Sequence, residues 1–326
     1  ICIKRFKHYT PQLSINGRPN KKLGYKFTLK IQVSVPKFLY GHNLTSVNPN
    51  DESLFYQRLK TSCRSLGVEL IGSPSEYKVI GFDPAINVFL TNYSTTNDAI
   101  RYLYRCYTSK LISLDKRDFR DKGHAIYLHQ GKWNFVMYDK VQDLIKPRYK
   151  RMDKNQNTKL KDLYEKVTDK EILRLELHGR DQKRLKKVIE KFYPGIEYVK
   201  CGDLFNELIW KYMIRDYFIQ KILQGNKLAL TLNDNAIDWY IRISKRYPNL
   251  TDKKIREKLS LVLIAKDPEG LKVYRRMYEK RHSQRQWYNM AKEIKELQSL
   301  AISDDYFSFI HDIDKALWYK DCLDIF

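Results

Sequence analysis

The amino-acid sequence predicts an α+β protein with two domains. Strand-like alternation of apolar and polar residues is confined to the first 200 residues or so, whereas amphipathic helical patterns fill the chain from about Cys201 onward. The Pro194-Gly195 pair breaks the chain close to this change. A length of 326 residues also suits about two domains of ordinary size. We therefore expect a mixed domain over residues 1–200 and an all-helical domain over residues 201–326.

Strands are expected where apolar and polar residues alternate and turn-forming residues follow. Pro36 closes the first strand, and Pro84 follows the second. Asp83 lies inside the second strand, where a charge is costly unless it is paired or bound to a metal ion. The expected strands are residues 25–35, 77–83 and 169–179, together with a hairpin over residues 123–140.

Helices are expected where apolar residues recur at helical spacing. Asp51 or Ser53 is placed to cap a helix that Gly67 ends, and residues 36–43 before it are interpreted as a loop. Beyond residue 200 the helical patterns follow one another with short interruptions. The predicted helices are residues 54–66, 97–108, 181–192, 204–223, 236–247, 252–265, 268–278, 283–300 and 304–319.

The hairpin contains a candidate nucleophile. Two runs rich in aromatic and β-branched residues flank a turn that contains Gly131. Side chains alternate across a strand, so Tyr138 and Lys140 are expected side by side on one face. A lysine ammonium stabilises the phenolate that forms when a tyrosine attacks a phosphate. A tyrosine and a lysine that meet solvent at a strand end are the simpler explanation of these residues alone.

The strand at residues 169–179 supplies candidate metal ligands. Every second residue is leucine, and Arg174, Glu176 and His178 lie between and after these leucines. Because the leucines are expected to face a core, a cation, a carboxylate and an imidazole gather on the other face. A Glu and a His two residues apart can reach one divalent ion, although an exposed face with a salt bridge fits equally well. His42 is a further candidate ligand or phosphate contact, or a residue that only holds its turn.

The composition indicates a polyanionic partner. Lys and Arg number 61 against 38 acidic residues, which gives a net charge of +23 and a pI near 9.6. Nucleic acid is the commonest such partner, and 24 Tyr with 5 Trp suit stacking on unpaired bases. A membrane surface is the competing partner, but no apolar run has the length needed to span a bilayer. The five scattered cysteines are typical of reduced thiols in a cytosolic protein.

The densest basic and aromatic segment is residues 274–287, in the helical half. It either faces DNA or forms a solvated helix surface with long cationic stems. The chain contains no P-loop, GxGxxG, HExxH or GxSxG motif, which excludes ATPase, dinucleotide-binding, zinc-protease and serine-hydrolase functions at the motif level.

The order of several short motifs resembles the gene II replication initiators of filamentous phages, which are related to plasmid rolling-circle initiators. The motifs lie between about Tyr25 and Leu300. They are Pro36-Lys37-Phe38-Leu39-Tyr40-Gly41-His42-Asn43, the strand aspartate Asp83, Val136-Met137-Tyr138-Asp139-Lys140, Leu173-Arg174-Leu175-Glu176 and Lys272-Val273-Tyr274-Arg275-Arg276.

This resemblance implies a single-strand-nicking endonuclease of the HUH-like class, on a five-stranded antiparallel sheet with flanking helices. Tyr138 matches the catalytic tyrosine of the family and Lys140 its neighbouring lysine, while Arg174 and Glu176 match an Arg-apolar-Glu strand. The usual His-apolar-His pair is absent and His178 departs from the family pattern, so acidic residues have more of the metal site to supply.

The implied mechanism is attack by Tyr138, giving a 5′-phosphotyrosine and a free 3′-OH for later rejoining. Lys140 and Arg174 would neutralise charge in the transition state. Mg²⁺ or Mn²⁺ would be held by Asp83, Glu176 and either His178 or His42. Origin DNA, a host helicase and a polymerase are the implied partners, in the cytoplasm of a bacterial host. The residues expected to bind DNA are Lys37, Asn43, Lys132, Arg275, Arg276, Lys280, Arg281 and Arg285.

Two other functions fit the same residues. In a non-catalytic nucleic-acid-binding protein, charge and aromatic residues suffice and Tyr138 is structural. A transposase or plasmid relaxase would use the same tyrosine chemistry on another DNA target. If Tyr138 is not the nucleophile, Tyr127 and Tyr149 are the next candidates.

Overall fold

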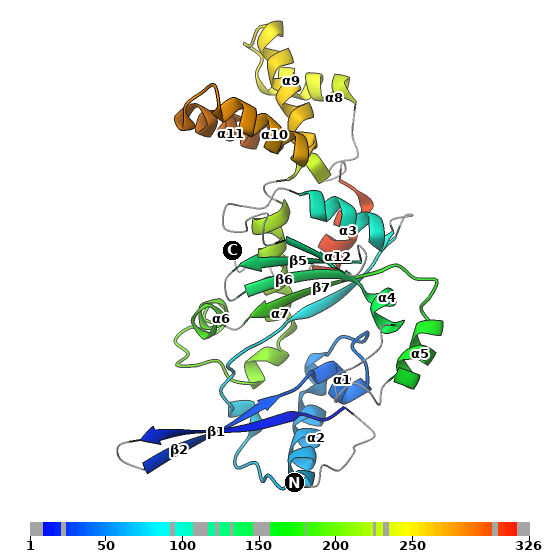
Figure 1. Cartoon of the computed structure of the whole chain (residues 1–326), viewed down its shortest axis with the longest axis vertical. Helices are drawn as coiled ribbons and strands as arrows, with labels where there is room; N and C mark the ends of the chain where they lie inside the picture. Colours follow the sequence, from blue (N-terminus) through cyan, green and yellow to red (C-terminus); the bar gives the residue numbers. More distant parts are fainter. Residues whose placement is uncertain are drawn as a thin grey trace. The chain divides into compact units, whose positions relative to one another are not determined.

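The chain forms two compact units in the computed structural model (Figure 1). The hairpin unit comprises Ile1–Phe82, Lys140–Lys170 and Arg180–Trp210, and the sheet unit comprises Asp83–Asp139, Glu171–Gly179 and Lys211–Phe326. These units do not follow the expected division at residue 200, because each collects segments that are distant in sequence. The structure describes residues 9–20, 24–91, 95–106, 117–120, 124–130, 133–145, 157–179, 181–223, 226–230, 235–301 and 306–317.

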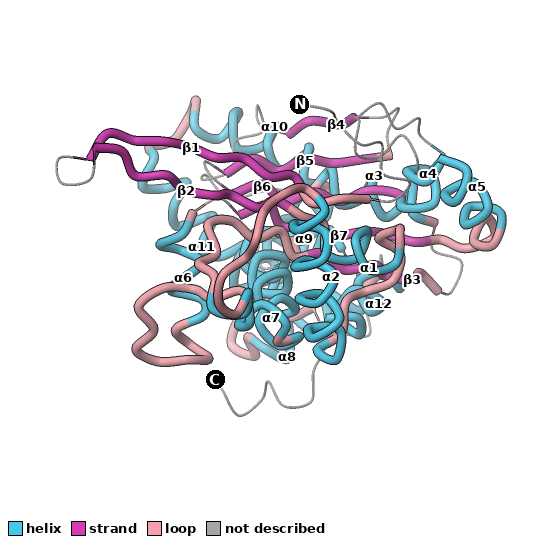
Figure 2. Tube along the Cα trace, turned by 90° about the horizontal axis from the view of Figure 1, so that it is seen from below, coloured by secondary structure: helices cyan, strands magenta, loops and turns pink. Residues whose placement is uncertain are grey.

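A two-stranded antiparallel ribbon gives the hairpin unit its name. Its strands are β1 (Gln12–Asn20) and β2 (Gly24–Gln32), which Figures 1 and 2 show side by side along their length. The prediction of a strand at residues 25–35 is confirmed for β2, whereas β1 was not predicted. The helices of this unit are α1 (Val35–Tyr40), α2 (Glu52–Ser65), α4 (Lys140–Ile145), α5 (Asn157–Glu165) and α6 (Gln182–Ile189).

The core of the hairpin unit lies under α1 and α2. Phe55 and Leu59 of α2 pack with Leu39 of α1, and Leu13 and Ile31 from the base of the ribbon pack against this core. The helix predicted at residues 54–66 is confirmed as α2, and it ends before a glycine with a φ of 80°, at position 67. Residues 36–43 do not form a simple loop, because α1 occupies their first half with its proline in the first turn.

The larger sheet is antiparallel, with the strand order β3-β7-β6-β5-β4. The α+β class is therefore confirmed. The β5–β6 hairpin and the β7 strand occur where the sequence predicted them. The strands are β3 (Ala85–Phe89), β4 (Arg117–Arg120), β5 (Ala125–Gln130), β6 (Trp133–Asp139) and β7 (Ile172–Gly179).

The strand predicted at residues 77–83 is wrong. Residues 77–83 form no strand: only Lys78, which pairs with Lys200, and Phe82 are bridge residues, and β3 begins after Pro84. Proline has no backbone N–H, but the Pro84 carbonyl accepts a hydrogen bond from the Leu177 N–H at 2.9 Å, so Pro84 can stand directly before the edge strand β3. Asp83 consequently lies just outside the sheet, with its side chain 56% exposed.

Helices cover one face of this sheet. The covering helices are α3 (Thr96–Arg105), α7 (Glu207–Phe218) and α12 (Ser308–Leu317). Tyr217 of α7 stacks on Phe135 of β6 with ring centroids 4.9 Å apart, and both side chains are buried. Asp312 of α12 accepts hydrogen bonds from Thr91, just after β3. Two of the helices beyond residue 200 therefore complete the core of the sheet instead of forming a separate domain.

Four other helices pack against one another and form the helical cluster. They surround the buried side chains of Trp239, Ile243, Val262 and Leu297. Their bounds agree with the predicted helices to within a few residues. They are α8 (Ala236–Arg246), α9 (Asp252–Lys266), α10 (Pro268–Glu279) and α11 (Gln284–Gln298).

Two further properties concern the helices and the cysteines among the described residues. None of their helices is both long and apolar enough to cross a lipid bilayer. Their three cysteines, Cys63, Cys106 and Cys201, are free thiols.

Candidate active site

Three polar side chains of β7 lie on one face of the sheet, because residues of a strand alternate between its two faces. The leucines of β7 are buried on the other face. Arg174, Glu176 and His178 share the polar face, as the sequence predicted. Tyr138 of β6 is the register partner of Arg174, so the neighbouring strand adds a phenol to the same face.

Glu176 connects the tyrosine to the arginine. The Tyr138 hydroxyl donates a hydrogen bond to Glu176 Oε1 at 3.0 Å. Arg174 Nε donates to the same oxygen at 2.5 Å, and Arg174 Nη1 donates to Asn87 Oδ1 of β3 at 2.9 Å. The Arg174 side chain is only 8% exposed. A buried guanidinium, held from two strands, therefore fixes the carboxylate beside the phenol.

His178 lies between Glu176 and Asp83. Its Nε2 is 3.4 Å from Glu176 Oε2, and its Nδ1 is 3.2 Å from Asp83 Oδ2. Asp83 Oδ1 also accepts a hydrogen bond from the Gly179 backbone N–H at 3.1 Å. The hydrogen bonds to Asp83 and then to Glu176 raise the pKa of His178 to about 9, against the opposing effect of burial. His178 is therefore a cation at neutral pH. The six residues Glu176, His178, Asp83, Tyr138, Arg174 and Asn87 are called the Glu176 cluster below.

Glu176 remains ionised in these surroundings. Burial alone would raise its pKa, but the hydrogen bond with His178 and the charge of Arg174 outweigh burial and hold the pKa of Glu176 well below its usual range. Side-chain exposure rises along the cluster, from 17% at Glu176 to 36% at His178 and 56% at Asp83. The cluster is thus closed at the Arg174 end and open to solvent at the Asp83 end.

The donor atoms of the cluster are of the kinds that a divalent ion binds, but their positions are not those of a metal site. Carboxylate oxygens from Asp83 and Glu176 and an imidazole nitrogen from His178 are ligands that Mg²⁺ and Mn²⁺ accept. Among the described residues, however, no group of three or more His, Cys, Asp or Glu side chains is placed to hold a metal ion. His178 occupies the space between the two carboxylates and engages both.

Lys140 does not share a strand face with Tyr138, so that prediction is wrong. The strand β6 ends at Asp139, and Lys140 is the first residue of α4. Its side chain is fully buried, and its Nζ donates a hydrogen bond to Asp143 Oδ2 at 2.6 Å. Lys140 belongs to the hairpin unit, whereas Tyr138 belongs to the sheet unit.

His42 holds the turn that follows α1. Its Nδ1 accepts a hydrogen bond from the Leu44 backbone N–H at 3.3 Å. Burial, and then the positive charge of Lys140, lower the pKa of His42. A neutral ring is what this acceptor role requires. His42 also belongs to the hairpin unit. The structure therefore supports its structural role and adds nothing for a role as a metal ligand.

The residues expected to bind DNA are distributed over both units. In the hairpin unit, the Lys37 ammonium lies 5.9 Å from the centroid of the Tyr9 ring, and Asn43 is half-buried in the turn after α1. Lys132 lies outside the described residues. In the helical cluster, the Arg275 guanidinium lies 5.5 Å from the centroid of the Trp287 ring.

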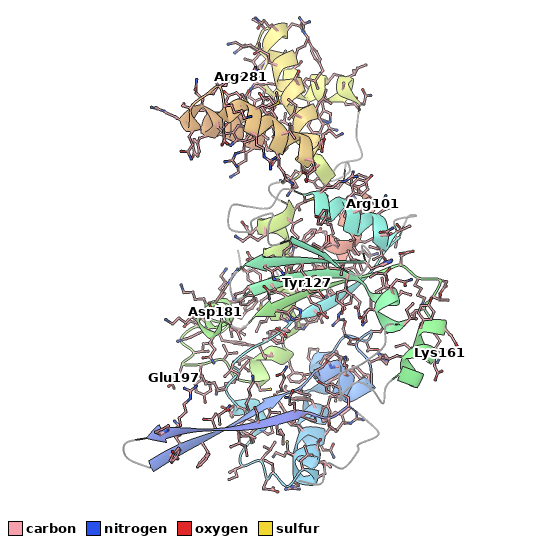
Figure 3. All side chains as sticks on the ribbon, in the orientation of Figure 1. Arg101, Tyr127, Lys161, Asp181, Glu197 and Arg281 are labelled. Carbon is pink, nitrogen blue, oxygen red and sulfur yellow. The ribbon has the colours of Figure 1, made fainter. Side chains whose placement is uncertain are left out.

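Four other predicted DNA contacts are exposed. Arg281, labelled in Figure 3, lies where α10 leads into α11. None of the four side chains forms an ion pair with another described residue, so their charges are available to a polyanion. The four are Arg276, Lys280, Arg281 and Arg285.

Asn87 is a cluster residue that the sequence analysis missed. Its signal was a single polar residue inside the otherwise apolar β3, where an unpaired amide would be costly. Its role becomes clear only from the register, which pairs Asn87 with Arg174.

No family model, curated protein or solved structure matches this chain. The likeness to the gene II initiators therefore consists of the short motifs quoted above. The chemical argument rests on the geometry of the Glu176 cluster.

Proposed function

We propose that this chain nicks one strand of a replication origin and remains joined to the 5′ phosphate through Tyr138. The observation that carries the proposal is the 3.0 Å hydrogen bond from the Tyr138 hydroxyl to Glu176, an ionised carboxylate that Arg174 fixes in place. The net charge of +23 supports a polyanionic substrate. The match of Tyr138 to the catalytic tyrosine of the gene II initiators supports the same assignment.

In the proposed step, the Tyr138 oxygen bonds to phosphorus and the bond from phosphorus to the 3′ oxygen breaks. Glu176 first accepts the phenol proton. An approaching phosphate anion raises the pKa of Glu176 toward the value that a base needs, because like charges oppose ionisation. The departing 3′ oxygen, on the opposite side of phosphorus, takes a proton from water and leaves as a hydroxyl, and Glu176 releases its proton to the solvent. The product keeps a phosphodiester linkage, so the reverse reaction can rejoin the strand.

Arg174 is the cation that the proposal assigns to the transition state. Its guanidinium is next to Glu176 and is the register partner of Tyr138. It is preorganised by Asn87, so no side-chain ordering is needed when negative charge develops. Lys140 receives no such role, because its ammonium is buried against Asp143.

Mg²⁺ or Mn²⁺ is the proposed cofactor, with Asp83 and Glu176 as its ligands. When bound, the ion supplies Lewis-acid polarisation of the scissile phosphate. His178 can join as a ligand only after it loses its proton, because a coordinating imidazole nitrogen must be neutral. The exposed Asp83 end of the cluster is the side from which an ion has access.

The helical cluster is proposed to hold the duplex part of the origin. Residues 235–301 contain sixteen Lys and Arg residues and eight Asp and Glu residues. Exposed cations such as Arg276 and Arg281 would neutralise phosphates without reading sequence. The free 3′-OH left by the nick would then serve a host polymerase, with a host helicase opening the duplex.

Tyr138→Phe tests the proposal. The variant is expected to form no covalent adduct with single-stranded oligonucleotides and to lose nicking, because only the attacking oxygen is removed. Its affinity for DNA should stay close to wild type. Tyr127→Phe is the matched control, since Tyr127 lies on the same sheet face on the neighbouring strand β5 (Figure 3). Both variants are incubated with an oligonucleotide pool and Mn²⁺, and adducts are separated on denaturing gels.

An adduct formed by Tyr138→Phe at the wild-type rate would move the nucleophile to Tyr127 or to Tyr149, which lies outside the described residues. If neither the wild-type protein nor any variant forms an adduct, the chain binds nucleic acid without cutting it. One observation favours this second function: Glu176 is satisfied by Arg174, His178 and Tyr138 as in a purely structural ion-pair network. A relaxase or transposase would differ from the proposed initiator only in the DNA sequence recovered in the adducts.

A further inference from the structure

The β1–β2 ribbon lies in a segment of the chain that carries only positive charges. The first fifty residues contain nine Lys and Arg residues and no Asp or Glu. Elsewhere many cations are paired with carboxylates, for example Arg275 with Glu279. In the ribbon no carboxylate is available from the ribbon itself, so its cations repel one another and attract a polyanion.

The register divides the ribbon into two different faces. Arg18 lies directly opposite Lys26, and Lys30 lies opposite Ser14, so these cations share one face. Residues opposite each other share a face, and alternate residues lie on the other face. The second face contains Leu13, Ile15, Pro19, Tyr25, Phe27, Leu29 and Ile31.

The apolar face is covered only at its base. Leu13 and Ile31 pack against the core under α1 and α2. Farther along the ribbon, Ile15 is 67% exposed, Tyr25 61% and Phe27 69%. A two-stranded ribbon is marginally stable by itself, and exposed aromatic residues add a cost that a bound partner removes.

The two exposed rings lie next to each other with nearly parallel planes. Tyr25 and Phe27 are stacked with centroids 6.2 Å apart and an interplanar angle of 24°. Gly17 is opposite Phe27, and a Cβ atom at this position would lie 2.9 Å from the Phe27 ring. The absence of a side chain at Gly17 therefore leaves room for the Phe27 ring beside the neighbouring strand. Nucleic-acid bases are the planar partners that stack on such rings.

We propose that the ribbon binds DNA where the two strands separate, with unpaired bases stacked on Tyr25 and Phe27 and phosphates held by Arg18, Lys26 and Lys30. The ribbon is a single layer of two strands. Cations on one face therefore lie within about one Debye length, about 8–10 Å, of DNA on the other face, so their attraction is only partly screened. A lipid surface fits less well, because the cations lie on the face opposite to the aromatic residues. This inference deepens the proposed nicking function, which requires unpaired DNA.

The test compares the binding of a forked duplex with unpaired dT arms and of a fully paired duplex of the same length. All proteins contain Tyr138→Phe, so no cleavage occurs and binding is measured separately from chemistry. Fluorescence anisotropy of labelled DNA is recorded over a range of salt concentrations. The measurement does not depend on nicking, so fork binding can be found even if the proposed nicking function is wrong. The two proposals can therefore fail separately.

Tyr25→Ala combined with Phe27→Ala is expected to weaken fork binding about ten- to a hundred-fold, because stacking on two rings is lost. The salt dependence and the affinity for paired duplex should change little. A variant with Tyr25→Phe and Phe27→Tyr keeps both rings and should bind the fork as tightly as the wild-type ribbon does. Lys26→Gln combined with Lys30→Gln should instead make the salt dependence shallower. Ile71→Ala is the control, since Ile71 is 87% exposed in the same unit.

Wild-type fork affinity in the double alanine variant would overturn the proposal. Two further measurements identify the occupant in that case. Loss of self-association in sedimentation would assign the aromatic face to a second copy of the chain. Loss of binding to vesicles that contain anionic lipid would assign it to a membrane surface.

Discussion

Glu176→Gln is expected to destabilise the sheet unit, because it leaves the buried Arg174 guanidinium without its carboxylate. The Arg174 side chain is 8% exposed and donates to Glu176 at 2.5 Å. Removing one partner of a buried ion pair costs about 3–5 kcal/mol, since the remaining charge is uncompensated. Glutamine has nearly the shape of glutamate, so lost packing contributes little.

With an unfolding entropy of about 2.1 cal/mol/K per residue, about 3–5 kcal/mol corresponds in a chain of 326 residues to a fall in Tm of roughly 4–7 °C. Thermal unfolding followed by near-UV circular dichroism, at neutral pH with EDTA, measures this shift. Glu69→Gln is the matched control. Glu69 also forms an ion pair with an arginine, Arg64, at 2.7 Å, but its side chain is 63% exposed. Its substitution should leave the Tm unchanged.

A second variant separates the buried charge from other effects. Arg174→Met combined with Glu176→Gln should recover part of the lost Tm, because neither charge of the pair is then buried. If Glu176→Gln melts within about 1 °C of wild type, Arg174 does not depend on this carboxylate and the argument for a preorganised cluster fails.

Three other outcomes are expected. In EDTA, stability should fall as pH rises from about 6.5 to about 9, because the pKa of His178 is raised to about 9 in the folded chain. With the side chain 36% exposed, the loss is about 1 kcal/mol, and His178→Gln should abolish this pH dependence in melting curves. Asp83→Asn should slow cleavage about 10- to 100-fold and raise the Mn²⁺ concentration needed for half-maximal rate, whereas His178→Ala should cost less. A chain that ends at residue 200 should lose its near-UV circular dichroism, because it lacks Tyr217, which stacks on Phe135.

The sequence by itself determined the elements whose signals are local. The strict alternation of β7 placed Arg174, Glu176 and His178 on one face, since the period of a strand is two residues wherever the strand lies. Helices α9 to α11 were predicted because apolar residues recur in them at helical spacing, and Thr251 stands as a cap before α9. The α+β class followed from these patterns alone.

Other local patterns were misleading because they do not mark where an element stops. In the sequence, the strand pattern of β6 continues to Lys140. In the structure, α4 begins at Lys140, and no glycine or proline marks the change. Pro84 reads as the end of a strand, yet β3 begins after it. In both places the choice depends on which backbone groups find partners in the folded chain.

Only the tertiary structure decided which side chains meet. The pairing of Tyr138 with Arg174 and of Asn87 with Arg174 depends on the register of three strands that are distant in sequence. The exposed pair of rings, Tyr25 and Phe27, depends likewise on the pairing of β2 with β1, because β1 had no recognised signal in the sequence. Register is set by the summed burial of whole strand faces, a property that no single stretch of sequence contains.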